Sequence, residues 1–416
     1  MIGKKFFIFV LSICSWATSA DISFYGRLEL NAAYEDGNTA GLWTSTVLPK
    51  ADTMQGRITL SAARTRLGFN LSDTSKQGEL EAAGRFEADF AGSNDFGNFN
   101  GSDKFRLRQS WGSVKFKNIG LTLLIGQTDN LMAPYDPPSV NPGSLAGVGN
   151  MGNRVPQIRL TQVLGPVDIS IAATHDRVRE GNDHRPPASP GVQGRLGLKL
   201  PAAWAGEKAN VATGITGHYA KEESANQNDK DREKRGPESW SLGLDLSLPI
   251  ISIMTFTGEF FMGQNLRNYD ASLGLHLLSN KYPDDPNYDN ILEHGIQSIG
   301  GWGAIEIKFP ADFSGATGIG MEVLDDGSVI SVKPVAKPGD DKPKSNMFAF
   351  ANLGYNFTST TKLTFEYLRL ASSYPNRIGE EPIGTRKGEP VFALNGPKVD
   401  NGNLNRYELN FRYSFK

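Results

Sequence analysis

The sequence predicts an all-β protein, a transmembrane antiparallel β-barrel of about 16 strands with long external loops and short periplasmic turns. Three observations lead to this fold class. Apolar and polar residues alternate along most of the chain, the connectors alternate between long and short, and no segment after the N-terminus is long and apolar enough for a membrane helix.

The alternation has a period of two residues, as expected for strands whose two faces meet different surroundings. It recurs near residues 24–34, 66–71, 80–90, 240–248 and 362–367. In the last segment one face carries Tyr407, Leu409, Phe411, Tyr413 and Phe415, and the other carries Arg406, Glu408, Asn410, Arg412 and Ser414. A soluble sandwich would show the same alternation, so this pattern alone does not distinguish it from a membrane barrel.

The lengths of the connectors distinguish a membrane barrel from a soluble sandwich. Long connectors lie near residues 35–56, 91–104, 129–153, 175–191, 220–238, 264–294, 325–345 and 371–402. Short connectors lie near residues 73–78, 118–120, 164–166, 201–208, 249–251, 310–314 and 358–361. Eight long and seven short connectors predict sixteen strands, with the loops at one end of a barrel and the turns at the other. A phase slip between Gln109 and Val114 predicts a bulge.

The composition agrees with a barrel that has only one apolar face. Charged residues make up 21% of the chain and the mean hydropathy is −0.35. The net charge is −2 and no basic block occurs, so a nucleic-acid partner is not expected. We expect outer-membrane lipid and lipopolysaccharide around the barrel.

The N-terminal segment has the features of an export signal. Lys4 and Lys5 precede an apolar stretch, and small residues lead to Ala20. We therefore predict a signal peptide at residues 1–20 and a single barrel domain at residues 21–416. Cys14, the only cysteine, would leave with the signal, so no disulfide is expected.

Candidate catalytic groups are few. His175-Asp176 could form half of a hydrolytic dyad, but two polar residues at a strand end are the more ordinary interpretation. No histidine, cysteine or carboxylate spacing predicts a metal site, and no motif predicts a cofactor. The chain is therefore not expected to be an enzyme. An outer-membrane barrel hydrolase and a plugged barrel that acts as an adhesin or receptor remain the alternatives.

The residues expected to face the lumen include many arginines in the first half of the chain. By strand phase, the pore-lining candidates are Arg27, Arg64, Arg66, Arg85, Arg106, Arg108, Arg159 and Arg195. The planar guanidinium suits carboxylates and phosphates, so this clustering favours a preference for anions.

The third long connector, residues 129–153, is predicted to fold inward and to narrow the pore, with Asp129 and Asp136 as constriction residues. Acids there would face the arginines across the pore and set up a transverse field. The alternative is simple ion pairing of the arginines with Glu29, Glu87, Asp89, Glu259, Glu306 and Glu366.

Several short segments resemble the Gram-negative outer-membrane porin superfamily. They are Phe24-Tyr25-Gly26-Arg27-Leu28, Arg64-Thr65-Arg66-Leu67-Gly68-Phe69, Phe105-Arg106-Leu107-Arg108, Ile125-Gly126-Gln127-Thr128, Gln157-Ile158-Arg159 and the aromatic last strand. The run from Phe105 to Arg159 is similar to the DcaP-like porins. The chain departs from the family pattern in two ways: Lys416 follows the terminal aromatic residue, and the usual acidic-glycine tip of the constriction loop is absent.

The resemblance implies a water-filled channel for passive diffusion of ions and small hydrophilic solutes. Within the DcaP-like porins it further implies a homotrimer and anionic solutes of the dicarboxylate type.

Overall fold

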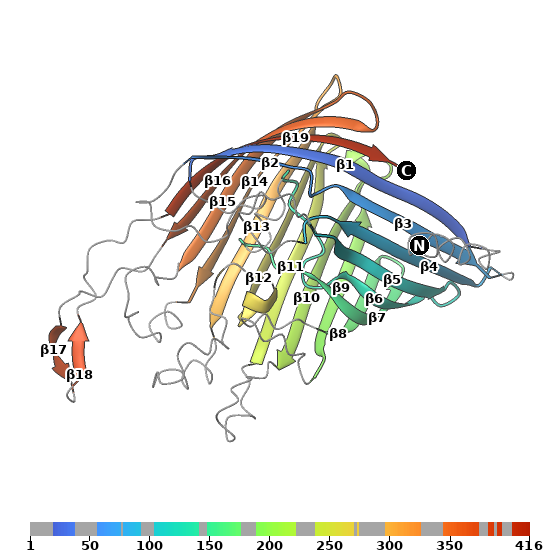
Figure 1. Cartoon of the computed structure of the whole chain (residues 1–416). Helices are drawn as coiled ribbons and strands as arrows, with labels where there is room; N and C mark the ends of the chain where they lie inside the picture. Colours follow the sequence, from blue (N-terminus) through green and yellow to red (C-terminus); the bar gives the residue numbers. More distant parts are fainter. Residues whose placement is uncertain are drawn as a thin grey trace, which may run out of the picture.

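The barrel is a single closed sheet. The computed structural model describes residues 20–37, 56–75, 78–92, 104–140, 148–175, 189–221, 238–269, 273, 296–325, 344–373, 382–386, 389–392 and 402–416. Seventeen antiparallel strand segments form the sheet, which closes because β1 (Asp21–Glu35) pairs with β19 (Gly402–Phe415) (Figure 1). β2 (Arg57–Ser61) and β3 (Arg66–Thr74) both pair with β1, so they are two pieces of one strand. The seventeen segments therefore amount to sixteen spanning strands, which confirms the predicted fold class.

The other barrel strands follow in chain order, and each pairs with the next. They are β4 (Leu80–Asp89), β5 (Arg106–Phe116), β6 (Leu121–Asp129), β7 (Arg154–Leu164), β8 (Val167–Thr174), β9 (Gly191–Pro201), β10 (Asn210–Lys221), β11 (Glu238–Ile251), β12 (Met254–Gln264), β13 (Gln297–Lys308), β14 (Phe313–Leu324), β15 (Ser345–Asn356) and β16 (Thr361–Ser373). Within the described connectors there are two short 3₁₀ helices, η2 (Ala203–Ala205) and η3 (Leu266–Tyr269). The last long connector also contains a small hairpin of β17 (Pro382–Arg386) and β18 (Glu389–Phe392).

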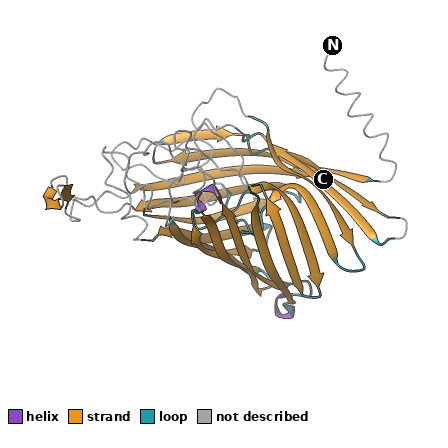
Figure 2. Cartoon of the chain, turned by 90° about the horizontal axis from the view of Figure 1, so that it is seen from below, coloured by secondary structure: helices purple, strands orange, loops and turns teal. Residues whose placement is uncertain are grey.

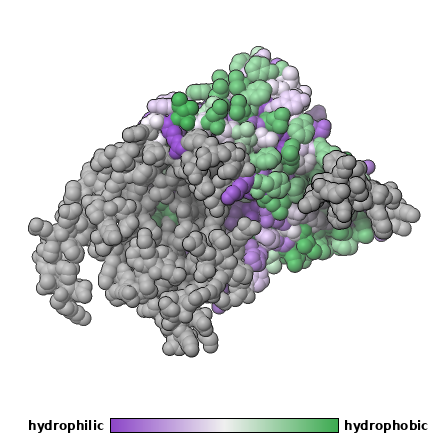
Figure 3. Space-filling model, viewed as in Figure 1, coloured by the Kyte–Doolittle hydropathy of each residue, from purple (hydrophilic) through white to green (hydrophobic). Residues whose placement is uncertain are grey.

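The exposure of the two strand faces excludes a soluble sandwich. On β11, Leu242 is 54% exposed, whereas Asp245 is 3% exposed. The apolar rows therefore face outward and the polar rows face the enclosed interior, which is the reverse of a soluble sandwich. Hydrophobic side chains accordingly gather on the outer surface of the described strands (Figure 3).

Short turns join the strands at one end of the barrel, where they appear as teal connections at the right of Figure 2. Residues 117–120 and 357–360 are examples of such turns. In the described ranges, no helix is long and apolar enough to cross a membrane.

Two irregularities affect the inner wall. The second spanning strand is interrupted at residues 62–65, where the amide of Thr65 donates to the carbonyl of Ala62 at 2.9 Å. The register between β4 and β5 shifts where Glu87 faces Gln109 and Ala88 faces Leu107, so the extra residue is Arg108. The predicted bulge is therefore present, one residue before the predicted range.

Candidate functional site

The third long connector, called L3 here (residues 129–153), lies against inward-facing side chains over its described parts, residues 130–140 and 148–153. Its first contacts are with β9 and β10. The amide of Leu131 donates to Oε1 of Gln193 at 3.0 Å, and Oγ1 of Thr216 donates to the carbonyl of Met132 at 3.3 Å. L3 therefore leaves β6 and runs inside the barrel instead of away from it.

The middle of L3 is bound by Glu259 of β12. The amide of Tyr135 donates to Oε1 of Glu259 at 2.8 Å. The indole of Trp302 on β13 donates to the other carboxylate oxygen at 2.9 Å. Both oxygens of this carboxylate are therefore used to hold the loop and the neighbouring wall.

A second carboxylate, Glu366 of β16, binds L3 farther along. Its two oxygens accept from the hydroxyl of Ser139 at 2.8 Å and from the amide of Val140 at 2.7 Å. Asn352 of β15 donates to the carbonyl of Pro138 at 2.9 Å and to Glu366 at 3.0 Å. Hydrogen bonds to a charged acceptor contribute about 1.5–3 kcal/mol each, so these contacts fix the position of the loop.

Two apolar clusters inside the barrel support the same placement. One contains Val148 of L3 with residues of β13 to β16 and β19, and Tyr135 packs against it. The other contains Met132 and Met151 of L3 with Phe261 and Tyr269. The loop is therefore held by both packing and hydrogen bonds.

The opposite side of the interior is lined by arginines on β1, β3, β5 and β19, which we call the arginine wall (Arg27, Arg66, Arg106, Arg108 and Arg412). Each lies beside a carboxylate of β1 or β4. The pairs are Arg27 Nε–Glu29 Oε2 at 2.7 Å, Arg412 Nε–Glu29 Oε2 at 3.5 Å, Arg66 Nη1–Glu87 Oε1 at 3.3 Å, Arg108 Nε–Glu87 Oε1 at 2.7 Å, Arg108 Nη1–Asp89 Oδ2 at 3.1 Å and Arg106 Nη2–Asp89 Oδ2 at 2.6 Å.

The partners in the arginine wall differ in exposure. The five arginine side chains keep 13–33% of their surface exposed, whereas Glu29, Glu87 and Asp89 keep 0–6%. The carboxylates thus lie behind the guanidinium groups. A solute in the interior meets mainly positive charge at this wall, although the formal charges are largely paired.

Arg64 differs from the other predicted pore-lining arginines. It lies in the interruption between β2 and β3 and is 3% exposed. Its guanidinium donates to the carbonyl of Val140 in L3 and to Glu408 of β19, and Nη1 lies 3.8 Å from Glu29. Arg406 continues this buried network by contacting Glu408 at 2.9 Å and Glu35. Arg64 therefore links L3 to the pair of strands that closes the barrel, β1 and β19.

The remaining predicted arginines lie outside the arginine wall. Arg159 on β7 donates to the carbonyl of Asp129 at 2.5 Å and to Gln157 at 2.9 Å. Arg195 on β9 pairs with Asp245 at 2.8 Å and with Asp168 at 3.2 Å, and here the carboxylate of Asp168 is more exposed than the arginine.

Arg85 on β4 donates to Oδ1 of Asn70 at 2.9 Å. Its guanidinium also lies over two aromatic rings, those of Tyr25 and Trp111. It therefore has different neighbours from every arginine of the wall.

The two acids predicted for the constriction lie at the start of L3 and in its middle. Asp129 accepts from Gln109 at 3.1 Å and pairs with Arg154 at 3.4 Å. The Asp136 side chain is exposed to the interior, but the surrounding wall removes part of its solvation and raises the pKa of its carboxyl above the ordinary value. The negative charge of Asp129 raises this pKa further, while the nearby arginines oppose the shift.

Candidate catalytic groups do not converge in the described part of the chain. His218 is buried between the hydroxyls of Ser241 at 2.7 Å and Ser239 at 3.1 Å, beneath the ring of Tyr269. Asp176, His184, His276 and His294 lie outside the described residues, as does the predicted signal segment before Ala20. The described histidine, cysteine and carboxylate residues form no group suited to a metal ion.

Two features of the site were missed in the sequence. The ion-pairing alternative predicts Glu259 and Glu366 as arginine partners, but both accept hydrogen bonds from the L3 backbone. Arg412 was not among the predicted pore residues, although it belongs to the arginine wall. Its inward phase in the last strand, next to β1 in a closed barrel, was the available signal.

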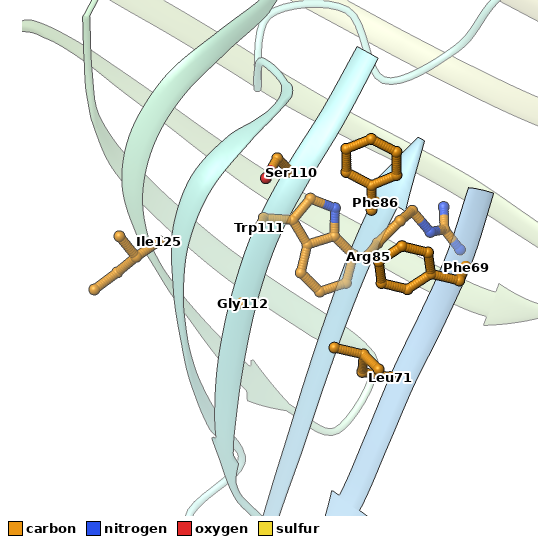
Figure 4. Close-up of a pocket in the computed structure, with 8 residues that line it drawn as sticks. All are labelled: Phe69, Leu71, Arg85, Phe86, Ser110, Trp111, Gly112 and Ile125. Carbon is orange, nitrogen blue, oxygen red and sulfur yellow. The ribbon is translucent and has the colours of Figure 1, made fainter. Parts of the chain in front are cut away.

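A hollow of about 400 Å³ lies at β3 to β6 (Figure 4). Phe69, Leu71, Phe86 and Ile125 line it, and Gly112 leaves its centre open. Arg85, Ser110 and Trp111 also line it. By strand pairing, Phe69, Leu71 and Phe86 lie on the apolar face of the sheet, whereas Arg85 and Trp111 belong to the other face. Most of its lining therefore belongs to the apolar face of the strands.

The comparisons agree on the fold. The Gram-negative porin family model matches residues 8–275. The chain is similar to the outer membrane channel DcaP of Acinetobacter baumannii, with a TM-score of 0.71, 17% identity, and coverage of 95% of this chain and 98% of that one. It is also similar to an anion-selective porin from Comamonas acidovorans (TM-score 0.57, 12% identity, coverage 95% and 100%) and to OprB of Pseudomonas putida (TM-score 0.55, 10% identity, coverage 97% and 96%). No curated protein sequence matches the chain.

Proposed function

This chain belongs to the Gram-negative porin family, and we propose that its channel prefers small anions, with dicarboxylates as the favoured organic solutes. Membership of the family establishes a β-barrel channel of the Gram-negative outer membrane that conducts solutes by passive diffusion. Porins are channels and not enzymes. The preference for anions, the narrowing of the channel by L3 and the assembly into a homotrimer are proposals.

The observation that carries the proposal is the unequal exposure within the arginine wall. Simple ion pairing would present both signs to a passing solute. Here the carboxylates lie behind the arginines and away from the interior, so the field at this wall is dominated by guanidinium groups. Planar guanidinium groups bind carboxylates through two parallel hydrogen bonds, which favours organic acids over cations.

L3 is proposed to narrow the channel opposite the arginine wall. Glu259 and Glu366 use their oxygens to bind the backbone and hydroxyl groups of the loop, so these two charges are turned away from the solute path. The loop would therefore reduce the width of the pore and also mask negative charge. Asp129 and Asp136 would supply the remaining negative charge near the narrow region.

The fold similarity to a porin described as anion-selective supports the preference for anions without establishing it. The run from Phe105 to Arg159 resembles the DcaP-like porins, which supports dicarboxylates as the organic class and a homotrimer as the assembly. Arg27, Arg66, Arg106, Arg108 and Arg159 would contact the solute. Arg64 would act indirectly, because it is almost completely buried.

The decisive test is the reversal potential of the purified protein in planar bilayers under a potassium chloride gradient, repeated with potassium succinate. We expect chloride to be more permeant than potassium, and succinate to carry measurable current. A preference for potassium would overturn the proposal. A complete lack of open steps would instead support a plugged barrel.

Processing and assembly are separate parts of the proposal. We expect cleavage after Ala20, so the mature chain would begin at Asp21, and we expect a homotrimer surrounded by lipid and lipopolysaccharide. N-terminal sequencing of the protein from outer membranes tests the first expectation. Native mass spectrometry in detergent tests the second, and a monomer stable at all concentrations would contradict it.

A further inference from the structure

We propose that Arg85, together with Tyr25 and Trp111, forms a second anion site that selects organic acids with one carboxylate on a flat apolar body, such as benzoate. The inference rests on the proposed anion channel, because it assigns a further binding step inside the same pore. It concerns a position distinct from the arginine wall.

Arg85 differs from the wall in having no carboxylate partner among the described residues. Its Nε donates to Asn70 at 2.9 Å. The two terminal nitrogens have no partner in the part of the chain that the structure describes. A guanidinium with an open edge offers the two parallel donors that a carboxylate requires.

Two aromatic rings hold the guanidinium in place. Its central carbon lies 5.6 Å from the ring centre of Tyr25 and 5.9 Å from that of Trp111. Tyr25 reaches it from β1 and Trp111 from the adjacent strand β5. Distances below about 6 Å allow a cation–π interaction, which orients the guanidinium and leaves its edge for a ligand.

Both rings are themselves fixed. The hydroxyl of Tyr25 donates to Glu87 at 3.1 Å, and the indole of Trp111 donates to Gln109 at 2.9 Å. Gly68 allows Tyr25 to lie across β3, because a Cβ at this position would come within 2.7 Å of the ring. The site is therefore largely formed before a solute arrives, which lowers the cost of binding.

The surroundings of Arg85 decide the class of ligand. At the arginine wall an apolar group would lie against charged side chains. At Arg85 it would lie against the two aromatic rings, whose carbon atoms provide van der Waals contact and burial from water. The site should therefore favour benzoate over acetate, although both carry a single carboxylate.

The location suits a step that follows the narrow region. Arg85 lies two residues before Glu87 on β4, and Tyr25 lies two residues before Arg27 on β1, in both cases toward the end with the short turns. Two residues of a strand span about 7 Å, so an anion that leaves the wall meets Arg85 next on its way to the short-turn end.

The test measures block of the chloride current by benzoate and by acetate in planar bilayers with the full-length protein. Wild type should be half-blocked by benzoate at a lower concentration than by acetate. Arg85→Gln should raise the half-blocking concentration of benzoate about ten-fold, which corresponds to about 1.4 kcal/mol. Arg85→Lys, which keeps the charge but loses the planar fork, should weaken the block several-fold.

The two rings are tested apart from Arg85 with the double variant Tyr25→Leu/Trp111→Leu. In this variant the half-blocking concentrations of benzoate and acetate should become similar, although Arg85 remains. Lys117→Gln, in an exposed turn, is the matched control and should match wild type. Equal benzoate block in Arg85→Gln and wild type would overturn the site, even if arginine-wall variants lose anion preference. If wall variants keep their reversal potential while Arg85→Gln loses benzoate block, the wall proposal fails and this site stands.

Discussion

Nη2 of Arg106 lies 2.6 Å from Oδ2 of Asp89, yet the arginine side chain keeps 31% of its surface exposed and the carboxylate keeps 3%. The pair is therefore close but unequal in its contact with the interior. Water and solutes reach the guanidinium, whereas the strand and its neighbours shield the acid. An arginine in such an ion pair binds its carboxylate and still presents positive charge to the pore.

Replacing Arg66 and Arg108 with glutamine should lower the preference for anions. Two charges removed at about 10 Å from the solute path change the energy of an ion by roughly 0.8 kcal/mol in a water-like dielectric, so the permeability ratio should fall about two- to four-fold. Reversal potentials in a potassium chloride gradient measure this change. Lys117→Gln removes a charge from a turn and should have no effect. An unchanged ratio in the double variant would exclude the arginine wall as the source of selectivity.

Replacing Glu259 or Glu366 with alanine should loosen L3. Each substitution removes hydrogen bonds to the loop, and charge-assisted bonds of this kind contribute about 1.5–3 kcal/mol each. We expect larger and noisier open steps in single-channel recordings, with the strongest effect in the double variant. Glu81→Ala, near the short-turn end and with a side chain that is 44% exposed, should keep the wild-type conductance. A double variant that conducts like wild type would show that other contacts position the loop.

Arg64→Met should affect stability more than selectivity. The arginine is buried and bridges Val140 with Glu408 and Glu29, so its loss removes one cation from a buried network. Arg406 still pairs with Glu408 and Arg27 still pairs with Glu29, so the cost should stay below the roughly 3–5 kcal/mol of a fully unpaired buried charge. The temperature at which the folded band is converted to the unfolded band on a denaturing gel should fall. Arg66→Gln, at a more exposed position, serves as the comparison. If Arg64→Met shifts the reversal potential as much as Arg66→Gln without loss of stability, Arg64 is a pore-lining residue after all.

Anion preference should rise as the pH falls toward the acidic range, partly because of Asp136. Its raised pKa means that the carboxyl takes up a proton at a pH above the ordinary value of about 3.9. Protonation removes a negative charge near the pore and leaves the arginines charged. Asp136→Asn should therefore show higher anion preference than wild type at neutral pH, and the two should converge on acidification.

Asp312→Asn is the matched control for this pH dependence. Asp312 lies in a short turn with a positive φ of 64°, a conformation that asparagine also tolerates. The anion preference of the Asp312→Asn variant should depend on pH in the same way as that of wild type. A wild-type curve that coincides with Asp136→Asn at every pH would contradict the assigned role.

The sequence predicted the barrel well because the features that define a membrane barrel, strand alternation and connector length, depend on residues close together in the sequence. Leu242 and Asp245 have opposite phases in one strand, and the structure places them on opposite faces. Long and short connectors alternate in the sequence because they occupy opposite ends of the barrel. The hairpin of β17 and β18 was not indicated, since its strands are short and lack a sustained alternation.

The site was predicted less completely. Strand phase directed Arg66 and Arg106 inward, but it could not show that Arg64 is covered by Val140. Phase also suggested Glu366 as an arginine partner, whereas the backbone of L3 reaches it first. These outcomes depend on where a loop lies after the barrel has closed, which residue spacing along a strand does not encode.

The sequence by itself determined which side chains face lipid and which face the interior, because the two-residue period of a strand fixes this locally. Only the tertiary structure decided which inward charges remain accessible. Closure brings β19 beside β1, and the packing of L3 covers one set of carboxylates while the arginine wall covers another. Burial and charge pairing are relations between distant residues, so they arise only when the sheet has closed around the loop.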